Sequence, residues 1–365
     1  MLSSQLHRFA ASLLLLSACP TAVGDGAFND PKIKVTVGSS MLLSARFDAV
    51  VHKLADGSLF VHGNRSTDDG ETWTHSPAAV RAGFHDKWRQ SAGCVLRDGT
   101  FIGLGAKHEF TQLDQRILKV YRSKDNLKTV IGPIDAVFGI PQGTGGRSET
   151  GEYTGAAIVE HSLIERQDGT LIACAYGWWK GDEEYSMLEK YVPEMNLYKT
   201  RAWVISSKDH GNTWQTLGSP GYWPELGPEG MGEPGMTELA NGDLLMVLRN
   251  GEWGKPIFQT RSTDGGQTWS KPVKLPATGV WPTPHLLSNG LLVLAVGRSR
   301  SPNYYLWVSP DGRGEMWTSR TLVAKGGKGY ASVVEVAPGQ LVYSGYNKQK
   351  RALQIWKIKI EQIVE

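Results

Sequence analysis

The sequence predicts an all-β fold, a six-bladed β-propeller whose last blade is closed by the N-terminal strand. Two independent repeats lead to this prediction. The pattern Ser-x-Asp-x-Gly-x-Thr-Trp occurs at residues 66–73, 207–214 and 262–269, with degraded copies at 123–130 and 309–317. A short turn with a central glycine recurs at positions 57, 99, 169, 242, 290 and 339. A unit that returns every few tens of residues is typical of propellers and other repeat folds.

The second repeat predicts hairpins, because each glycine turn is flanked by apolar, β-rich runs. Each of the first five turns is followed by one copy of the Ser-Asp pattern, whereas the sixth has none. A propeller explains the difference if a strand at Lys32–Val37 forms the outer strand of the last blade. Closing the ring in this way also removes exposed sheet edges.

The intervals on either side of the third turn are long, and they predict insertions near residues 131–153 and 178–200. Long loops in a compact domain are usually functional. The second insertion carries aromatic residues at positions 178, 179, 185, 191 and 198. These rings either stack on sugars or pack against their own scaffold, and the sequence favours neither interpretation.

Composition indicates a globular fold, because 40% of the chain is hydrophobic. The repeats account for nearly the whole chain, so we expect one domain over residues 25–365. The net charge of +3 is small for this length, so nucleic-acid binding is not expected. Three cysteines exclude a disulfide scaffold, and no metal-ligand spacing or cofactor motif occurs. We therefore expect neither a metal nor a cofactor, and the oligomeric state is left open.

The first 24 residues predict a signal peptide, since His7 and Arg8 precede an apolar run at residues 9–16 that is too short to span a bilayer. Two cleavage sites stay open. Residues 16–19 resemble a bacterial lipobox that would lipidate Cys19 and tether the protein to a membrane. Residues 22–24 suit ordinary signal peptidase. We favour the lipobox and expect an exported bacterial protein that is periplasmic, anchored in the outer membrane or secreted.

The Ser-Asp pattern is chemically suited to a tight turn. Ser and Asp side chains bond nearby backbone N–H groups, glycine accepts a positive φ, and Trp covers the hairpin. The pattern is the Asp-box, and from about Val37 onward the chain resembles the sialidase-like (BNR/Asp-box) β-propeller family, in particular exo-α-sialidases. In that family the box is structural, so Asp68, Asp209 and Asp264 are poor catalytic candidates.

The resemblance becomes specific in four segments. Residues 46–51 resemble the segment with the first arginine of a substrate-binding triad, here Arg46. Residues 232–249 resemble the segment that carries the catalytic Glu233 and the second arginine, Arg249. Arg298, with Arg300 as an alternate, fits the third arginine. Residues 328–334 resemble the segment with the nucleophile, Tyr330.

The resemblance implies a glycoside hydrolase for acidic sugars, an exo-α-sialidase with a retaining mechanism. Three arginines suit bidentate binding of a carboxylate. A sialoside carries its carboxylate on the anomeric carbon, where it would repel an anionic nucleophile. A neutral Tyr330 avoids this repulsion, but a phenol with a pKa of about 10 needs a base, here Glu233.

The general acid is where the sequence departs from the family. The loop that carries the family's Asp is absent, because residues 59–65 run straight into the first box. Asp48 is the substitute, since residues two apart on a strand share a face with each other, although it equally suits an ion pair with Arg46. Further candidate substrate contacts are Arg65, Arg89, His161 and His285, and the two histidines are also alternative acids.

Two other functions stay open. A uronic-acid polysaccharide lyase also needs a carboxylate neutraliser and a Tyr or His that moves protons. A catalytically inert propeller that binds glycans would need no chemistry from Tyr330.

Overall fold

The computed structural model describes residues 28–44, 50–75, 90–105, 109–112, 115–140, 143, 146–147, 153–155, 157–185, 198–251, 254–297, 303–327, 329–347 and 349–363. Their regular structure is β apart from one 3-10 turn at Pro224–Leu226, which confirms the all-β class. No helix in these ranges is long and apolar enough to cross a membrane.

The strands follow one another as antiparallel meanders. The first comprises β2 (His52–Lys53), β3 (Leu59–Val61), β4 (Asn64–Ser66) and β5 (Thr74–His75). The second comprises β6 (Gln90–Val95), β7 (Phe101–Gly105), β9 (Gln115–Ser123) and β10 (Ile131–Gly139), with β8 (Glu109–Gln112) beside β9. The third comprises β13 (Ala157–Glu165), β14 (Leu171–Gly177), β15 (Arg201–Ser207) and β16 (Trp214–Gly218).

The C-terminal half continues the pattern. One sheet comprises β17 (Gly232–Glu238), β18 (Leu244–Arg249), β19 (Pro256–Ser262) and β20 (Val273–Thr278). The next comprises β21 (Val280–Leu286), β22 (Leu292–Gly297), β23 (Tyr304–Ser309) and β24 (Ser319–Ala324). The last comprises β25 (Ala331–Ala337), β26 (Gln340–Asn347), β27 (Ala352–Gln362) and β1 (Ile33–Leu43).

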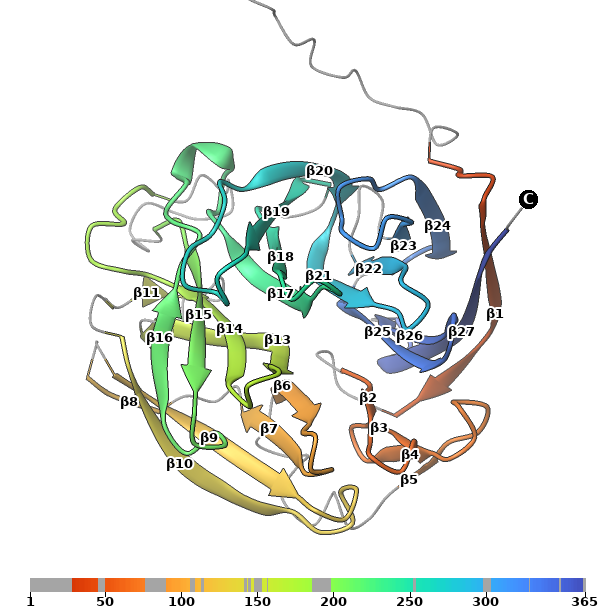
Figure 1. Cartoon of the computed structure of the whole chain (residues 1–365), viewed down its shortest axis with the longest axis horizontal. Coiled ribbons are helices and arrows are strands. Elements are labelled where there is room, and N and C mark those ends of the chain that lie inside the picture. The colour runs from red at the N-terminus through yellow and green to blue at the C-terminus, as the bar shows by residue number, and fades with distance from the viewer. Residues whose placement is uncertain are drawn as a thin grey trace, which may run out of the picture.

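The sheets stand in a ring with their first strands innermost, which is a propeller-like arrangement (Figure 1). The first strands contact one another in sequence, β2 with β6, β6 with β13, and onward through β17, β21 and β25 back to β2. The second and third meanders are not separate sheets. β10 and β16 pair in parallel at residues 138–139 and 214–215, which joins the two meanders into one nine-stranded sheet. The number of separate blades stays a prediction.

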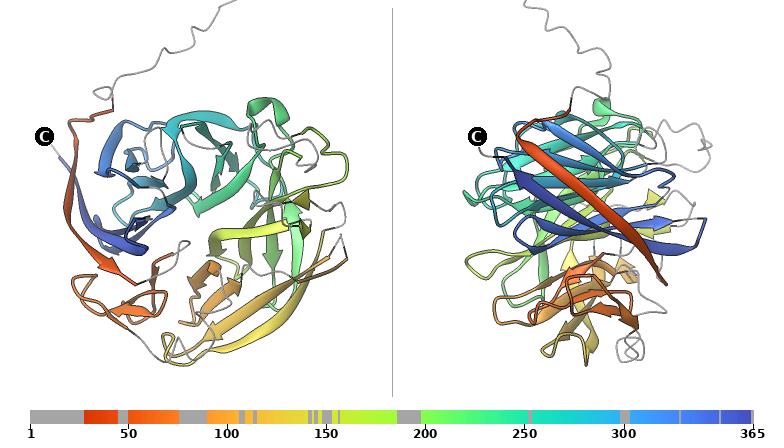
Figure 2. Two further views of the ribbon diagram at one scale, coloured as in Figure 1. Left: turned by 180° about the vertical axis from the view of Figure 1, so that it is seen from behind. Right: turned by 90° about the vertical axis from the view of Figure 1, so that its right-hand side faces the viewer.

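The N-terminal strand closes the last sheet, as the sequence predicts. β1 runs antiparallel to β27 from Ile33 opposite Gln362 to Leu43 opposite Leu353. The two strands lie side by side along the edge of the molecule (Figure 2). β1 extends beyond the predicted 32–37, with a register shift between Val37 and Ser40.

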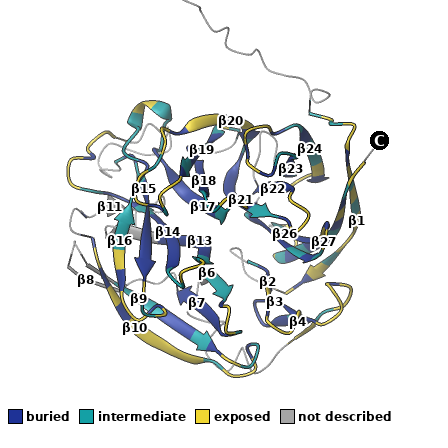
Figure 3. Ribbon diagram, viewed as in Figure 1, coloured by how far each residue is buried: buried dark blue, intermediate teal, exposed yellow. Residues whose placement is uncertain are grey.

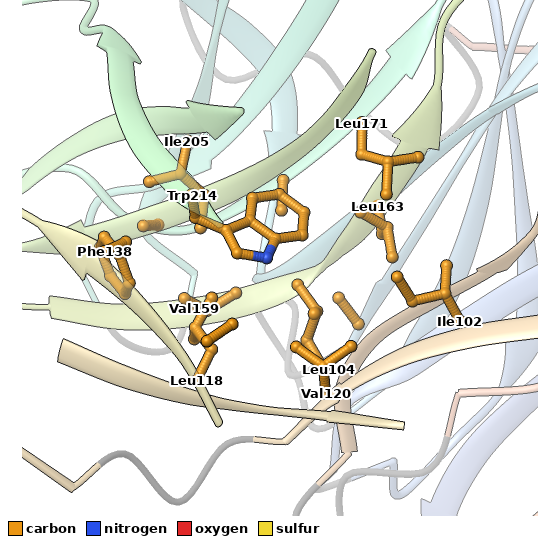
Figure 4. Close-up of a cluster of buried hydrophobic side chains, with 14 of the residues drawn as sticks. Ile102, Leu104, Leu118, Val120, Phe138, Val159, Leu163, Leu171, Ile205 and Trp214 are labelled. Carbon is orange, nitrogen blue, oxygen red and sulfur yellow. The ribbon is translucent and has the colours of Figure 1, made fainter. Parts of the chain in front are cut away.

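The core lies between neighbouring sheets, where the strands are buried (Figure 3). One cluster joins the second and third meanders and includes Leu118, Phe138, Val159 and Ile205 (Figure 4). Trp214, the last residue of an Asp-box, is part of this cluster. Burial of this apolar surface between sheets is what holds adjacent meanders together.

The Asp-boxes form the turns that the sequence predicts. In the first box Ser66 Oγ donates to Asp68 Oδ1 at 2.7 Å, and Thr72 N–H donates to the same oxygen at 2.9 Å. The Trp73 indole N–H donates to the Gly70 carbonyl at 3.1 Å. Hydrogen bonds from Thr72 lower the pKa of Asp68 to about 2. Asp68 therefore caps a turn between the third and fourth strands of its sheet.

The first predicted insertion, residues 131–153, begins later in the chain than the sequence suggests. Residues 131–139 form strand β10, so the first insertion starts later and contains the small pair β11 (Gly146–Arg147) and β12 (Tyr153–Gly155). In the second, Trp178 is buried and donates to the Tyr198 carbonyl at 2.9 Å, which is packing within the scaffold. The Tyr198 ring stacks on that of Tyr185. Tyr191 lies outside the described residues.

Candidate active site

Glu233 and Arg249 form a buried ion pair because β17 and β18 are antiparallel and place Gly232 opposite Arg249. Arg249 Nη1 lies 2.6 Å from Glu233 Oε1, and both side chains are about 5% exposed or less. Arg249 Nη2 lies 2.7 Å from Glu229 Oε2, and Nε donates to the Gly251 carbonyl at 3.1 Å. Each nitrogen of Arg249 thus has a protein partner, and the guanidinium orients Glu233.

Tyr330 reaches the same glutamate from the residue that precedes β25. Its hydroxyl donates to Glu233 Oε1 at 2.8 Å, and its side chain is half-buried. The backbone N–H of Trp281 donates to Glu233 Oε2 at 3.0 Å. Glu233 therefore accepts hydrogen bonds from Arg249 of β18, Trp281 of β21 and Tyr330 just before β25. These bonds hold its carboxylate as an acceptor for the phenol proton.

The ring of Tyr330 is the first of three stacked aromatic rings. The Tyr330 ring lies on the Trp281 indole, with centroids 4.2 Å apart and planes 14° apart. The other face of the indole is covered by His161 at 4.4 Å and 19°. Trp281 is 7% exposed and His161 is 5% exposed. The stack extends from the half-buried phenol into the protein.

His161 is buried in this stack, and its role as a substrate contact stays a prediction. Its Nε2 donates to the Pro282 carbonyl at 3.1 Å, and its Nδ1 lies 3.4 Å from Glu160 Oε2. Burial lowers the pKa of His161 to about 4. The imidazole is neutral at neutral pH and is a poor general acid there.

Glu233 and Trp281 share an unusual backbone. Their φ angles are +42° and +52°, in the left-handed region that non-glycine residues seldom adopt. Each is the second residue of its strand, is followed by proline and lies at a register shift of the inner hairpin. Such strain costs about 1–3 kcal/mol per residue and is concentrated at functional sites. The local backbone turns the Glu233 side chain and the Trp281 N–H toward each other.

The hydrogen bond between the Trp281 N–H and the Glu233 carboxylate requires a close approach of β17 to β21. A Cβ atom on Gly235 would lie 1.9 Å from the Pro282 carbonyl oxygen and 3.0 Å from His161 Nε2. Only glycine lets the two strands come this near.

Among the described contacts, Arg65 and His285 bind elsewhere than at this group, and their roles as substrate contacts stay predictions. Arg65 donates to Ser58 Oγ at 2.6 Å and to the Asn126 carbonyl, so it fastens a hairpin turn to the neighbouring sheet. His285 lies four residues along β21 from Trp281, opposite Val293 of β22. Burial lowers the pKa of His285, and its charged neighbours are Glu335 and Lys53.

Several predicted residues lie outside the described residues, namely Cys19, Arg46, Asp48, Arg89, Arg298 and Arg300. Their roles stay predictions. Among the described residues no group of His, Cys, Asp and Glu has the geometry of a metal site. Sequence reasoning also missed Trp281, although Trp281-Pro282 repeats the Glu233-Pro234 position one sheet later and could have indicated it.

The fold and the site define an all-β, propeller-like domain with a Tyr–Glu–Arg cluster, in which Glu233 and Tyr330 lie where inner strands begin and Arg249 ends the neighbouring strand β18. The family model for a BNR repeat-like domain matches residues 147–343, more than half of the chain. The chain belongs to this BNR repeat-like family. No curated protein matches the chain.

Solved structures share the fold at low sequence identity. A Dyadobacter fermentans protein of unknown function is 16% identical, with a TM-score of 0.65 over 91% of this chain and 100% of its own. A Hadza microbial sialidase is 17% identical, with a TM-score of 0.58 over 87% of this chain and 66% of its own. A GH93 α-L-arabinofuranosidase of Fusarium graminearum, solved with arabinobiose, is 14% identical, with a TM-score of 0.57 over 92% and 95%. At these identities the likeness establishes the fold alone.

Proposed function

We propose that this protein is a retaining glycoside hydrolase that acts on acidic sugars, an exo-α-sialidase in which Tyr330 is the nucleophile. One observation carries the proposal. The Tyr330 hydroxyl donates to a carboxylate oxygen of Glu233 at 2.8 Å, and Glu233 is itself fixed by Arg249 and the Trp281 N–H. A phenol beside a fixed carboxylate is the arrangement that an activated Tyr nucleophile needs.

The chemistry proceeds in two steps. Tyr330 Oη attacks the anomeric carbon as its proton passes to Glu233, the bond to the leaving oxygen breaks, and a general acid protonates that oxygen. Water then attacks the glycosyl-tyrosine, gives a proton to the general acid's conjugate base, and the departing Tyr330 oxygen recovers its proton from Glu233. Two displacements at one carbon retain its configuration. Asp48 is proposed as the general acid.

An acidic substrate is proposed from the choice of nucleophile. A neutral phenol suits an anomeric carbon that bears a carboxylate, because an anionic nucleophile would be repelled there. Arg249 is already bound to Glu233 and Glu229, so we assign the substrate carboxylate chiefly to Arg46 and Arg298. The half-buried side chain of Tyr330 is compatible with access from the solvent side of the stack.

Burial of His161 weighs against a lyase that uses this residue to remove a proton. Its ring lies under Trp281, and Nε2 donates to the Pro282 carbonyl. The hydrolase needs no proton from this imidazole.

A turnover assay with a fluorogenic α-sialoside tests the proposal. Glu233→Gln should lower kcat by about 10²–10⁴-fold, the usual contribution of a positioned base, and Tyr330→Phe should abolish measurable turnover. Tyr305→Phe removes a phenol hydroxyl from β23, away from the Tyr330–Glu233 pair. It is the matched control and should retain activity. A fluorogenic α-L-arabinofuranoside tests whether a neutral sugar is preferred. Full activity in Tyr330→Phe would contradict the hydrolase, as would release of an unsaturated uronate when a uronic-acid polysaccharide is supplied as the substrate.

We further propose that the ring is a six-bladed propeller. The sequential contacts of β2, β6, β13, β17, β21 and β25 support this count. We also propose that residues 1–24 are a signal peptide that directs export and that Cys19 is lipidated as a membrane tether, on the basis of the apolar run at residues 9–16 and the lipobox-like residues 16–19.

A further inference from the structure

We propose that Trp281 is a positioning residue that keeps the Tyr330 phenol within hydrogen-bonding distance of the Glu233 carboxylate. Its ring fixes the plane of the phenol, and its backbone N–H fixes the carboxylate. The catalytic consequence rests on the proposed function, whereas the positioning itself does not.

The indole is placed to support Tyr330 rather than to bind a sugar. Sugar-binding tryptophans present an open face to the ligand, but both faces of this indole are covered. Tyr330 lies on one face at 4.2 Å and His161 on the other at 4.4 Å. Only 7% of Trp281 is exposed. Nearly parallel planes over such a distance leave the phenol little freedom to tilt.

The same residue also reaches Glu233. The Trp281 N–H donates to Glu233 Oε2 at 3.0 Å, while the Tyr330 hydroxyl donates to Oε1 at 2.8 Å. Trp281 is therefore linked to both partners of the proton transfer. Its φ of +52° is what points the N–H toward Glu233 while the indole lies under Tyr330.

A further contact ties this support to the backbone beside Tyr330. Thr283, two residues after Trp281, donates its hydroxyl to the Ala331 carbonyl at 3.0 Å. The strand that carries Trp281 thus fixes the main chain next to the phenol as well as its ring. Loss of the indole would remove its stacking on Tyr330 but leave the Trp281 N–H bond to Glu233 and the Thr283 bond to the Ala331 carbonyl. The contribution of the stacking can therefore be measured separately.

The size of the expected effect follows from geometry. Without the indole the phenol can rotate about its side-chain torsions, and its oxygen can leave Glu233 and the reacting carbon. Misplacement by about 1 Å in an active site can cost about 100-fold in rate. Substrate affinity should change little, because the indole has no open face for a ligand.

Two substitutions and one control test the inference. Trp281→Leu removes the aromatic face and keeps the backbone N–H, whereas Trp281→Phe keeps a smaller aromatic face. Trp317→Leu is the control, because Trp317 has the same exposed fraction of 7% but belongs to a hydrophobic core cluster that Trp281 does not join. We expect Trp281→Leu to lower kcat about 10–100-fold with KM within about threefold, Trp281→Phe to recover most of the activity, and Trp317→Leu to be nearly unchanged.

Crystal structures of the variants provide a readout that needs no substrate. In Trp281→Leu the Tyr330 hydroxyl should leave Glu233, and in Trp281→Phe it should stay. If Tyr330 remains 2.8 Å from Glu233 in the leucine variant, the inference is wrong whatever reaction the protein catalyses. If the phenol moves as expected but Tyr330→Phe is fully active, the inference stands and the proposed function falls. Equal losses of kcat in Trp281→Leu and Trp317→Leu would also overturn it.

Discussion

Replacing His161 by glutamine should make the folded protein less sensitive to mild acid. The imidazole is buried under Trp281, and this burial lowers its pKa from 6.5 to about 4. Between these two values the unfolded chain binds a proton that the folded chain does not bind. Stability is therefore unaffected above pH 6.5 and falls as the pH decreases toward 4.

The magnitude follows from the two pKa values. Each pH unit between 6.5 and about 4 costs roughly 1.4 kcal/mol, so His161 removes roughly 3 kcal/mol from the free energy of unfolding across this window. Such a loss is a large fraction of the stability of a typical domain. It should be visible in an ordinary denaturation experiment.

Urea denaturation at about pH 7 and about pH 4.5 measures the effect. His161→Gln should lose less stability between these pH values than the wild-type protein, because glutamine does not titrate. Carboxyl groups that do not contact His161 also titrate near the lower pH, but they do so in both proteins and cancel in the comparison. His75→Gln, at an exposed position on β5, is the matched control and should keep the wild-type dependence. An identical pH dependence in wild type and His161→Gln would refute the burial argument.

Two further predictions concern buried groups. Arg249→Met should destabilise the protein by about 3–5 kcal/mol in urea denaturation, because Glu233 would be left buried without its cation. Glu229→Gln keeps the Arg249–Glu233 pair and should lower the free energy of unfolding clearly less than Arg249→Met does. Equal losses of stability in the two variants would argue against the pair as the dominant contact. Burial raises the pKa of the Cys174 thiol, so peptide mapping should find this residue unmodified by thiol reagents in the native protein and labelled after unfolding. Rapid labelling of native Cys174 would contradict its burial.

The fold was largely predictable because its signals are local. An Asp-box needs only eight consecutive residues, and Ser66, Asp68 and Thr72 bond within that segment. The glycine turns are equally local. The nine-stranded sheet was not predicted, since the parallel pairing of β10 with β16 joins residues about 75 positions apart and leaves no periodic signal.

The site was predictable only in part. Tyr330, Glu233 and Arg249 meet, as their order along the chain and the family resemblance indicated. The place of His285 relative to Trp281 could not be predicted, because a position just before a turn identifies a strand but not which of its ends lies at the site. A seven-residue strand is about 20 Å long, so the two ends of β21 are far apart. Trp281 was missed because its role depends on a left-handed φ and on contacts with two other strands.

The covalent intermediate is the most direct test of the central claim. A reaction with an α-sialoside is quenched rapidly in acid during turnover. The protein is then digested, and the mass of the peptide that contains Tyr330 is measured by mass spectrometry. We predict a mass increase of one glycosyl residue located on Tyr330, absent when Tyr330→Phe is treated in the same way. A glycosyl group found on a carboxylate such as Glu233, with Tyr330 unmodified, would contradict the account.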